Sequence, residues 1–130
     1  MDIEIRNSKL LGRGVFALKN FKKDEIIEKA PVLVFPPKHR KILEKTQLNY
    51  YLYPWKSLKS AAIALGYGSI YNHSFDPNAD WKQNFKNQTM EYRALKNIKK
   101  GEEILVNYNG EPDDKTPIDW FGWEYKSEYK

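Results

Sequence analysis

The amino-acid sequence predicts a mainly β protein with a few short helices, and two observations support this. Residues 2–6 alternate between charged side chains and isoleucine, which is the pattern of a half-buried strand. A longer segment occurs twice, as "ALKNFKKDEII" at residues 17–27 and as "ALKNIKKGEEI" at residues 94–104. Each copy has apolar stretches on both sides of a Lys-Lys turn, so we expect two similar β corners, each made of two strands joined by a loop.

The remaining elements follow from local composition. Runs of β-branched and aromatic side chains predict further strands at residues 31–35, 49–53, 79–84 and 88–94. Only two segments read as helices, and both are short: "PKHRKILEKTQL" at residues 37–48 and the region around "WKSLKSAAIAL" at residues 55–65.

Proline and glycine divide the chain. "GEPDDKTP" at residues 110–117 marks a loop that separates a body, residues 1–110, from a tail, residues 111–130, rich in aromatic and acidic side chains. A length of 130 residues fits one domain.

Composition excludes several kinds of chemistry. The chain has no cysteine, which rules out disulfides, thiolate zinc sites and cysteine nucleophiles. The N-terminal residues lack the apolar stretch of a signal peptide, and no window approaches the ~20 apolar residues of a membrane span. We therefore expect a soluble, intracellular protein.

Charge is unevenly distributed along the chain, whose net charge is +5. The body holds 19 of the 22 Lys and Arg residues and 11 of the 17 acids, whereas the tail holds 3 bases and 6 acids. Two interpretations remain open: a solvated surface that favours solubility, or a body that lies near nucleic acid with a tail that attracts a cationic substrate.

Two motifs contain candidate functional residues. In "GRG" two glycines flank Arg13, and glycine lets backbone amides approach a ligand closely, although an ordinary turn has the same composition. In "NHSFDPNA" His73 follows Asn72 and precedes turn residues. A zinc site at His73 would need partners that the chain scarcely offers, and neighbouring Ser74 and Asp76 would not line up with it as a hydrolase triad.

The motifs occur in a specific order: "GRGVFA" near the start, "NHSFDPNA" in the middle and "GEEILVNY" about thirty residues later. In this order they resemble the SET-domain family of protein-lysine methyltransferases, across most of residues 3–109. The chain looks most like the minimal, stand-alone SET proteins known from viruses and microbes. The resemblance implies a β-clip-like fold of several small β-sheets around a pseudo-knot, in which the segment containing Tyr108 threads past the loop containing Asn72 and His73.

The resemblance also implies a function. It predicts transfer of a methyl group from S-adenosyl-L-methionine to a lysine amine of a basic protein such as a histone, a DNA-packaging protein or a ribosomal protein. It implies a cytoplasmic location or one associated with chromatin or a nucleoid, a possible homodimer, no membrane partner and no requirement for nucleic acid. The alternative is a catalytically inactive SET-like module that binds chromatin protein or nucleic acid.

Matching the motifs residue by residue assigns the site. Arg13 and Gly14 would lie against the cofactor through their backbone, while Asn72 and His73 would hold its amino-acid end and adenine. Tyr108 matches the family's active-site tyrosine. Tyr51 resembles a second catalytic aromatic of the lysine channel, although other tyrosines of "NYYLYPW" are alternatives.

The walls and the lid of the lysine channel are less closely matched. Trp81 falls where some members place a channel tyrosine, and Tyr67 is assigned to the channel or lid. Many members close the channel with a cysteine-rich zinc cluster, which this chain cannot form. We expect the tail, with Trp120 and Trp123, to act as the lid; the alternative is that these rings pack on the core or at a dimer interface.

Overall fold

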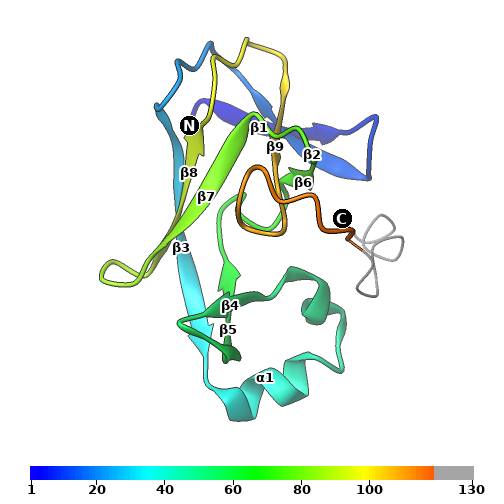
Figure 1. Ribbon diagram of the computed structural model, residues 1–130, viewed down its shortest axis with the longest axis vertical. Helices are drawn as coiled ribbons and strands as arrows, with labels where there is room; N and C mark the ends of the chain where they lie inside the picture. Colours follow the sequence, from blue (N-terminus) through cyan, green and yellow to red (C-terminus); the bar gives the residue numbers. More distant parts are fainter. Residues whose placement is uncertain (119–130) are drawn as a thin grey trace.

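The computed structural model, shown in Figure 1, describes residues 1–118 and confirms a mainly β fold of small sheets. Its strands are β1 (Ile3–Asn7), β2 (Arg13–Ala17), β3 (Ile26–Phe35), β4 (Tyr53–Trp55), β5 (Ser57–Ala64), β6 (Asn72–His73), β7 (Ala79–Asn84), β8 (Thr89–Ala94) and β9 (Glu103–Val106). The helices are α1 (Pro37–Leu43) and the 3-10 helix η1 (Gln47–Tyr51). Over the described range, neither is long and apolar enough to cross a membrane.

The strands form two sheets. One has the order β1-β2-β9-β6 and the other the order β4-β5-β3-β8-β7. All neighbours are antiparallel except β6 and β9, which run parallel. Buried apolar side chains from both sheets form one core, which includes Ile3, Val15, Ala30, Tyr71, Met90, Tyr92 and Ile104.

The duplicated segments form the two expected β corners. The first copy connects β2 to β3 and the second connects β8 to β9, and in Figure 1 both lie at the end of the molecule opposite α1. They pair with each other through an antiparallel bridge, in which Phe21 and Ile98 exchange backbone hydrogen bonds of 2.8 Å in both directions.

The contacts around this bridge follow a local two-fold symmetry. The Oδ1 of Asn20 accepts from the amide of Lys100 at 2.8 Å, and the Oδ1 of Asn97 accepts from the amide of Lys23 at 2.9 Å. Because Asn20 and Asn97 occupy equivalent positions of the repeat, each corner caps the turn of the other. The repeat is therefore a structural unit in which both copies are needed.

Two segments differ from the sequence-based expectation. The strand expected at residues 49–53 is wrong, because most of it belongs to η1, where the side chain of Thr46 accepts from the amide of Leu48 and caps the helix. The helix expected around residues 55–65 is also wrong, because this segment forms β5. Its alanines favour a helix locally, but pairing with β3 buries them inside the sheet, and tertiary packing overrides propensity.

The crossing implied by the resemblance is present between β6 and β9. Asn72 pairs with Leu105 and His73 with Val106, which brings together residues distant in sequence. The loop after β6 then wraps β9: the Nδ2 of Asn78 donates to the carbonyl of Glu103 at 2.9 Å, and its Oδ1 accepts from the amide of Leu105 at 2.8 Å. These bonds satisfy backbone groups that an irregular crossing would otherwise leave buried without partners.

Candidate active site

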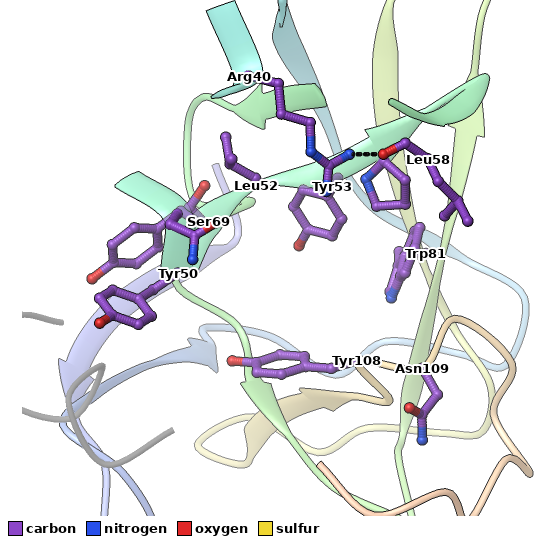
Figure 2. Close-up of a pocket in the computed structure, with 12 residues that line it drawn as sticks. Arg40, Tyr50, Leu52, Tyr53, Leu58, Ser69, Trp81, Tyr108 and Asn109 are labelled. Carbon is purple, nitrogen blue, oxygen red and sulfur yellow. Dashed lines mark hydrogen bonds between the residues drawn. The ribbon is translucent and has the colours of Figure 1, made fainter. Parts of the chain in front are cut away.

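A cavity of about 460 Å³ lies between β4, β7, η1 and the segment after β9. Figure 2 shows four of the aromatic side chains that line it, Tyr50, Tyr53, Trp81 and Tyr108. Tyr53 and Trp81 make an edge-to-face contact with ring centroids 5.1 Å apart. Aromatic walls of this kind suit an alkyl chain that ends in a cationic group, because ring faces attract cations.

Tyr108 is held at both ends at one side of this cavity. Its backbone amide donates to Nδ1 of His73 at 3.0 Å, and its hydroxyl donates to the carbonyl of Tyr71 at 2.6 Å. The second bond fixes the hydroxyl hydrogen, so a group in the cavity would meet the lone pairs of the oxygen.

Burial raises the pKa of Tyr108 well above its ordinary value, and the nearby ionisable groups Tyr53, Tyr51 and Glu103 raise it further. The hydroxyl is therefore neutral at physiological pH. A neutral phenol with so high a pKa cannot serve as a general base, whereas it can orient a polar group through its hydrogen bonds.

Two other tyrosines of the cavity, Tyr53 and Tyr51, also stay neutral. Burial raises the pKa of Tyr53 to about 12, against a smaller opposing effect of its hydrogen bond with Tyr92. Burial raises the pKa of Tyr51 as well, and the positive charge of Arg13 is among the influences that lower it. Arg13 is thus close enough to Tyr51 to affect its ionisation, which links the "GRG" segment to the aromatic cavity.

The structure brings together three of the four residues assigned to the cofactor. The Nδ2 of Asn72 lies 3.2 Å from the carbonyl of Arg13, 3.0 Å from that of Leu11 and 2.7 Å from Oε1 of Glu103, and donates to them. A Cβ added at Gly14 would lie 2.0 Å from Glu103 Oε1 and 2.9 Å from Asn72 Nδ2. A side chain here would force Glu103 and Asn72 to move, so Gly14 has a packing role whether or not it touches a ligand.

His73, the fourth of these residues, lies at the crossing rather than in the "GRG" turn. Its ring centroid is 5.3 Å from that of Tyr108, and its Nδ1 acts as an acceptor. Burial lowers the pKa of His73, which favours the neutral imidazole. The geometry therefore gives His73 a role in placing the backbone of Tyr108.

The residues present fit the cofactor that the resemblance implies. Arg13 is exposed and cationic, which suits a carboxylate. The carbonyls of Leu11 and Arg13 converge on one amide, and each has a second lone pair that can accept from an ammonium group. These groups match the amino-acid end of S-adenosyl-L-methionine. Within residues 1–118, no three His, Asp or Glu side chains gather to form a metal site.

The residues assigned to the channel and lid have different positions. Trp81 lines the cavity, and its Nε1 donates to the carbonyl of Asn107 at 3.1 Å. Tyr67 packs against the core and is not among the residues that line the cavity. Trp120 and Trp123 lie outside the described residues.

Sequence reasoning left the contribution of two cavity residues open or unnoticed. Tyr53 was one alternative within the tyrosine-rich run, and the structure places it beside Trp81. Arg40 of α1 reaches the rim, where its Nη1 donates to the carbonyl of Leu58 at 2.6 Å (Figure 2). The same nitrogen donates to the carbonyl of Ser60, also at 2.6 Å. Nothing in the local sequence around Arg40 indicates this position, because it depends on how α1 packs against β5.

Comparison with known proteins identifies the family. Residues 12–109 match the family model of the SET domain. The chain is 39% identical over 107 residues to the histone-lysine N-methyltransferase of Schizosaccharomyces pombe that is specific for lysine 37 of histone H3, an alignment that covers 82% of this chain and 72% of that protein.

Solved structures agree with this match. A candidate histone methyltransferase of Plasmodium falciparum is 36% identical, with a TM-score of 0.65 over 84% of this chain and 98% of that one. The Polycomb Repressive Complex 2 of Chaetomium thermophilum bound to the inhibitor GSK126 contains a similar fold, with a TM-score of 0.67, 22% identity and coverage of 82% of this chain but 15% of that one. This chain therefore belongs to the SET-domain family of protein-lysine methyltransferases.

Proposed function

We propose that this chain transfers a methyl group from S-adenosyl-L-methionine to the side-chain amine of a histone lysine. One observation carries the proposal: the anchored hydroxyl of Tyr108 lines an aromatic cavity beside the Asn72–His73 crossing. The similarity to a histone H3 methyltransferase supports the choice of substrate and a site of action at chromatin.

The chain's own residues account for the acceptor side of the reaction. The cofactor, when bound, supplies an electrophilic methyl group on a sulfonium. A lysine amine can accept the methyl group only as the neutral base, and deprotonation at neutral pH costs roughly 4–5 kcal/mol for a pKa of about 10.4. Burial between aromatic side chains lowers the pKa of an amine, because it disfavours the charged form.

Tyr108 and the cavity walls orient the amine. The hydroxyl oxygen of Tyr108 can accept a hydrogen bond from the amine, since its own hydrogen is committed to the carbonyl of Tyr71. Tyr53 and Trp81 restrict the direction of approach, and alignment of this kind supplies much of the rate enhancement in bimolecular transfers. The proton leaves to water, because the hydroxyl of Tyr108 is neutral and cannot take it up.

The residues that converge around the "GRG" segment would bind the cofactor. Arg13, Gly14 and Asn72 would hold the amino-acid end, and His73 would lie against the adenosine. Tyr51 would separate this group from the lysine cavity, since it lines the cavity and is influenced by the charge of Arg13.

The direct test is incubation of the purified chain with radiolabelled S-adenosyl-L-methionine and histone octamers, followed by mass spectrometry of the modified peptide. We expect label on a lysine of a histone. Tyr108→Phe should reduce methyl transfer by at least about 100-fold, the usual scale for a group that orients the reaction, and should leave cofactor affinity within about twofold by calorimetry.

Two results would contradict the proposal. If the wild-type chain binds the cofactor but labels no histone, the substrate assignment is wrong. If it neither binds cofactor nor transfers label yet binds histone or DNA, the inactive binding module is the better description.

A further inference from the structure

We propose that Glu28 of β3 is a positioning residue for Tyr108, which acts through the segment of residues 67–71 and so sets the rate of methyl transfer. This inference rests on the proposed role of Tyr108. It concerns a buried carboxylate that neither lines the cavity nor belongs to the three family motifs.

Glu28 accepts a hydrogen bond from each end of this segment. Glu28 is only 7% exposed. Each of its two side-chain oxygens accepts one hydrogen bond. Oε2 accepts from the backbone amide of Tyr67 at 2.9 Å, and Oε1 accepts from the hydroxyl of Tyr71 at 2.9 Å. Burial raises the pKa of Glu28, and its hydrogen bonds with Tyr67 and Tyr71 lower it. Because the two bonds join Glu28 to residues about forty positions away in sequence, the side chain restrains both ends of that segment.

The glycine before this segment makes room for the carboxylate. Gly66 has a φ of +60°, and a Cβ there would lie 2.4 Å from Oε2 of Glu28. Any other residue would collide with the oxygen that accepts from Tyr67, in addition to the strain of a positive φ. The carboxylate of Glu28 is therefore a second reason for glycine at position 66, besides its positive φ.

The middle of the segment is held by two tyrosines. The carbonyl of Gly68 accepts from the hydroxyl of Tyr53 at 3.0 Å and from that of Tyr92 at 2.8 Å. The ring of Tyr71 stacks on that of Tyr92 with centroids 4.3 Å apart. With the middle fixed in this way, the position of Tyr71 is set by its stacking and by the bond between its hydroxyl and Glu28.

Tyr71 is also the residue that anchors Tyr108. Its hydroxyl binds Glu28, and its carbonyl accepts the hydroxyl of Tyr108 at 2.6 Å. A displacement of Tyr71 therefore moves the hydroxyl that faces the cavity. Transfer reactions are sensitive to such displacements, because small errors in the position of the reacting groups lower the rate strongly.

A carboxylate suits position 28, because its two oxygens accept from both partners at once. In Glu28→Gln the amide oxygen can accept from Tyr67, but the NH₂ group then faces the hydroxyl of Tyr71. The hydroxyl of Tyr71 would then have to accept from the NH₂ group and direct its own hydrogen to another place in a buried site. The substitution keeps the volume and changes only the hydrogen bonding, so it tests the positioning role directly.

The kinetic test compares Glu28→Gln with Glu91→Gln. Glu91 is a half-buried carboxylate on the neighbouring strand β8, where it accepts from Asn84 at 3.0 Å; because side chains alternate along a strand, it lies on the opposite face from Tyr92. We expect Glu28→Gln to lower kcat about tenfold while the KM for a histone peptide and the cofactor Kd change less than about twofold, since the effect is on alignment. Glu91→Gln should leave kcat unchanged.

A second measurement needs neither cofactor nor activity. Tyrosine labelled with ¹³C at Cζ gives an NMR signal for each phenol, and Tyr108→Phe identifies that of Tyr108. We expect Glu28→Gln and Tyr71→Phe to shift this signal, and Glu91→Gln to leave it in place. Tyr71→Phe removes one bond only, so it preserves the test should Glu28→Gln fail to fold.

The two measurements also separate this inference from the proposed function. An active wild type whose kcat and Tyr108 signal are unchanged by both Glu28→Gln and Tyr71→Phe overturns the positioning role. Loss of kcat in Glu28→Gln with an unmoved Tyr108 signal overturns it too, because the effect would not pass through Tyr108. An inactive wild type in which the signal still shifts contradicts the proposed function and supports the link between Glu28 and Tyr108.

Discussion

At the scale of single residues, His73 works as a hydrogen-bond acceptor within the crossing. The neutral ring accepts the amide of Tyr108 through Nδ1, and a proton on that nitrogen would place two N–H groups face to face. Burial lowers the pKa of His73 in the folded chain, whereas the unfolded chain has the ordinary value of about 6.5. The unfolded state therefore binds the proton first as the solution becomes acidic.

This difference predicts how stability depends on pH. The contribution of His73 is fully present above about pH 6.5 and is lost as the pH falls through the lower pKa of the folded state. Thermal unfolding measured between pH 8 and pH 5 should show a fall in midpoint that is smaller in His73→Asn. His39 is exposed on α1 and is the control: if His39→Asn changes the profile as much as His73→Asn does, the assignment to His73 is wrong.

From sequence, motifs locate residues whose positions they fix. Two of the three motifs lead to Asn72, His73 and Tyr108, which the structure brings together at one crossing, while their roles stay a prediction. Glu28 could not be found in this way. Its partners, Tyr67 and Tyr71, lie about forty residues away, and no local pattern distinguishes its carboxylate from those on the surface.

At the scale of elements, the two β corners provide an internal comparison. Equivalent positions of the repeat hold Asp24, with a φ of +73°, and Gly101, with a φ of +92°. Glycine adopts this conformation without steric strain, whereas a residue with a Cβ does not. The first corner is therefore the more strained of two otherwise similar turns.

We expect Asp24→Gly to relieve this strain and Gly101→Ala to introduce it. A Cβ at Gly101 would meet no atom within 4 Å, so the cost of Gly101→Ala, about 1 kcal/mol, would come from the backbone alone. Asp24→Gly should leave stability unchanged or raise it by up to ~0.5 kcal/mol, since relief of strain is offset by the greater freedom of glycine in the unfolded chain. Urea unfolding of both variants would check this; a larger loss in Asp24→Gly than in Gly101→Ala would refute it.

Element prediction failed where tertiary contacts override local preference. The repeat predicted both corners, because each copy has a complete pattern of strand, turn and strand. The alanines of β5 have no such pattern, and only pairing with β3 and β4 makes the segment extended. Likewise the tyrosine-rich run forms a 3-10 helix that places its rings around the cavity.

At the scale of the whole molecule, the first part of the tail is joined to the body. The Nδ2 of Asn107 donates to the carbonyl of Asp114 at 2.7 Å, and that of Asn109 donates to the carbonyl of Thr116 at 2.9 Å. These contacts keep residues 111–118 beside the segment that ends in the cavity, where Asn109 is also a lining residue.

We propose that residues 119–130 act as a lid over the site, the role that a cysteine-rich zinc cluster has in many members of the family. Ending the chain after Ile118 would keep the contacts of Asn107 and Asn109 and remove only Trp120, Trp123 and their neighbours. We expect this truncation to weaken cofactor binding about tenfold, equivalent to ~1.4 kcal/mol, measured by calorimetry. An unchanged cofactor Kd would show that the tail has another role, such as packing on the core or between two copies of the chain.

The fold as a whole could be predicted only through the resemblance. Alternation and turn residues gave most strands, but nothing in their spacing indicates that β6 and β9 run parallel, because such pairing depends on how the chain threads. The motifs supplied that information.

This threading has a consequence for how the protein is made. Within residues 1–118, β9, which leads to Tyr108, is the last strand to leave the ribosome, and it must enter the loop after β6 before the crossing can form. Such distant contacts form slowly, because a long stretch of polypeptide must be ordered first. A nascent chain that stops before residue 103 would therefore hold the "GRG" and "NHS" motifs and still lack both β9 and Tyr108.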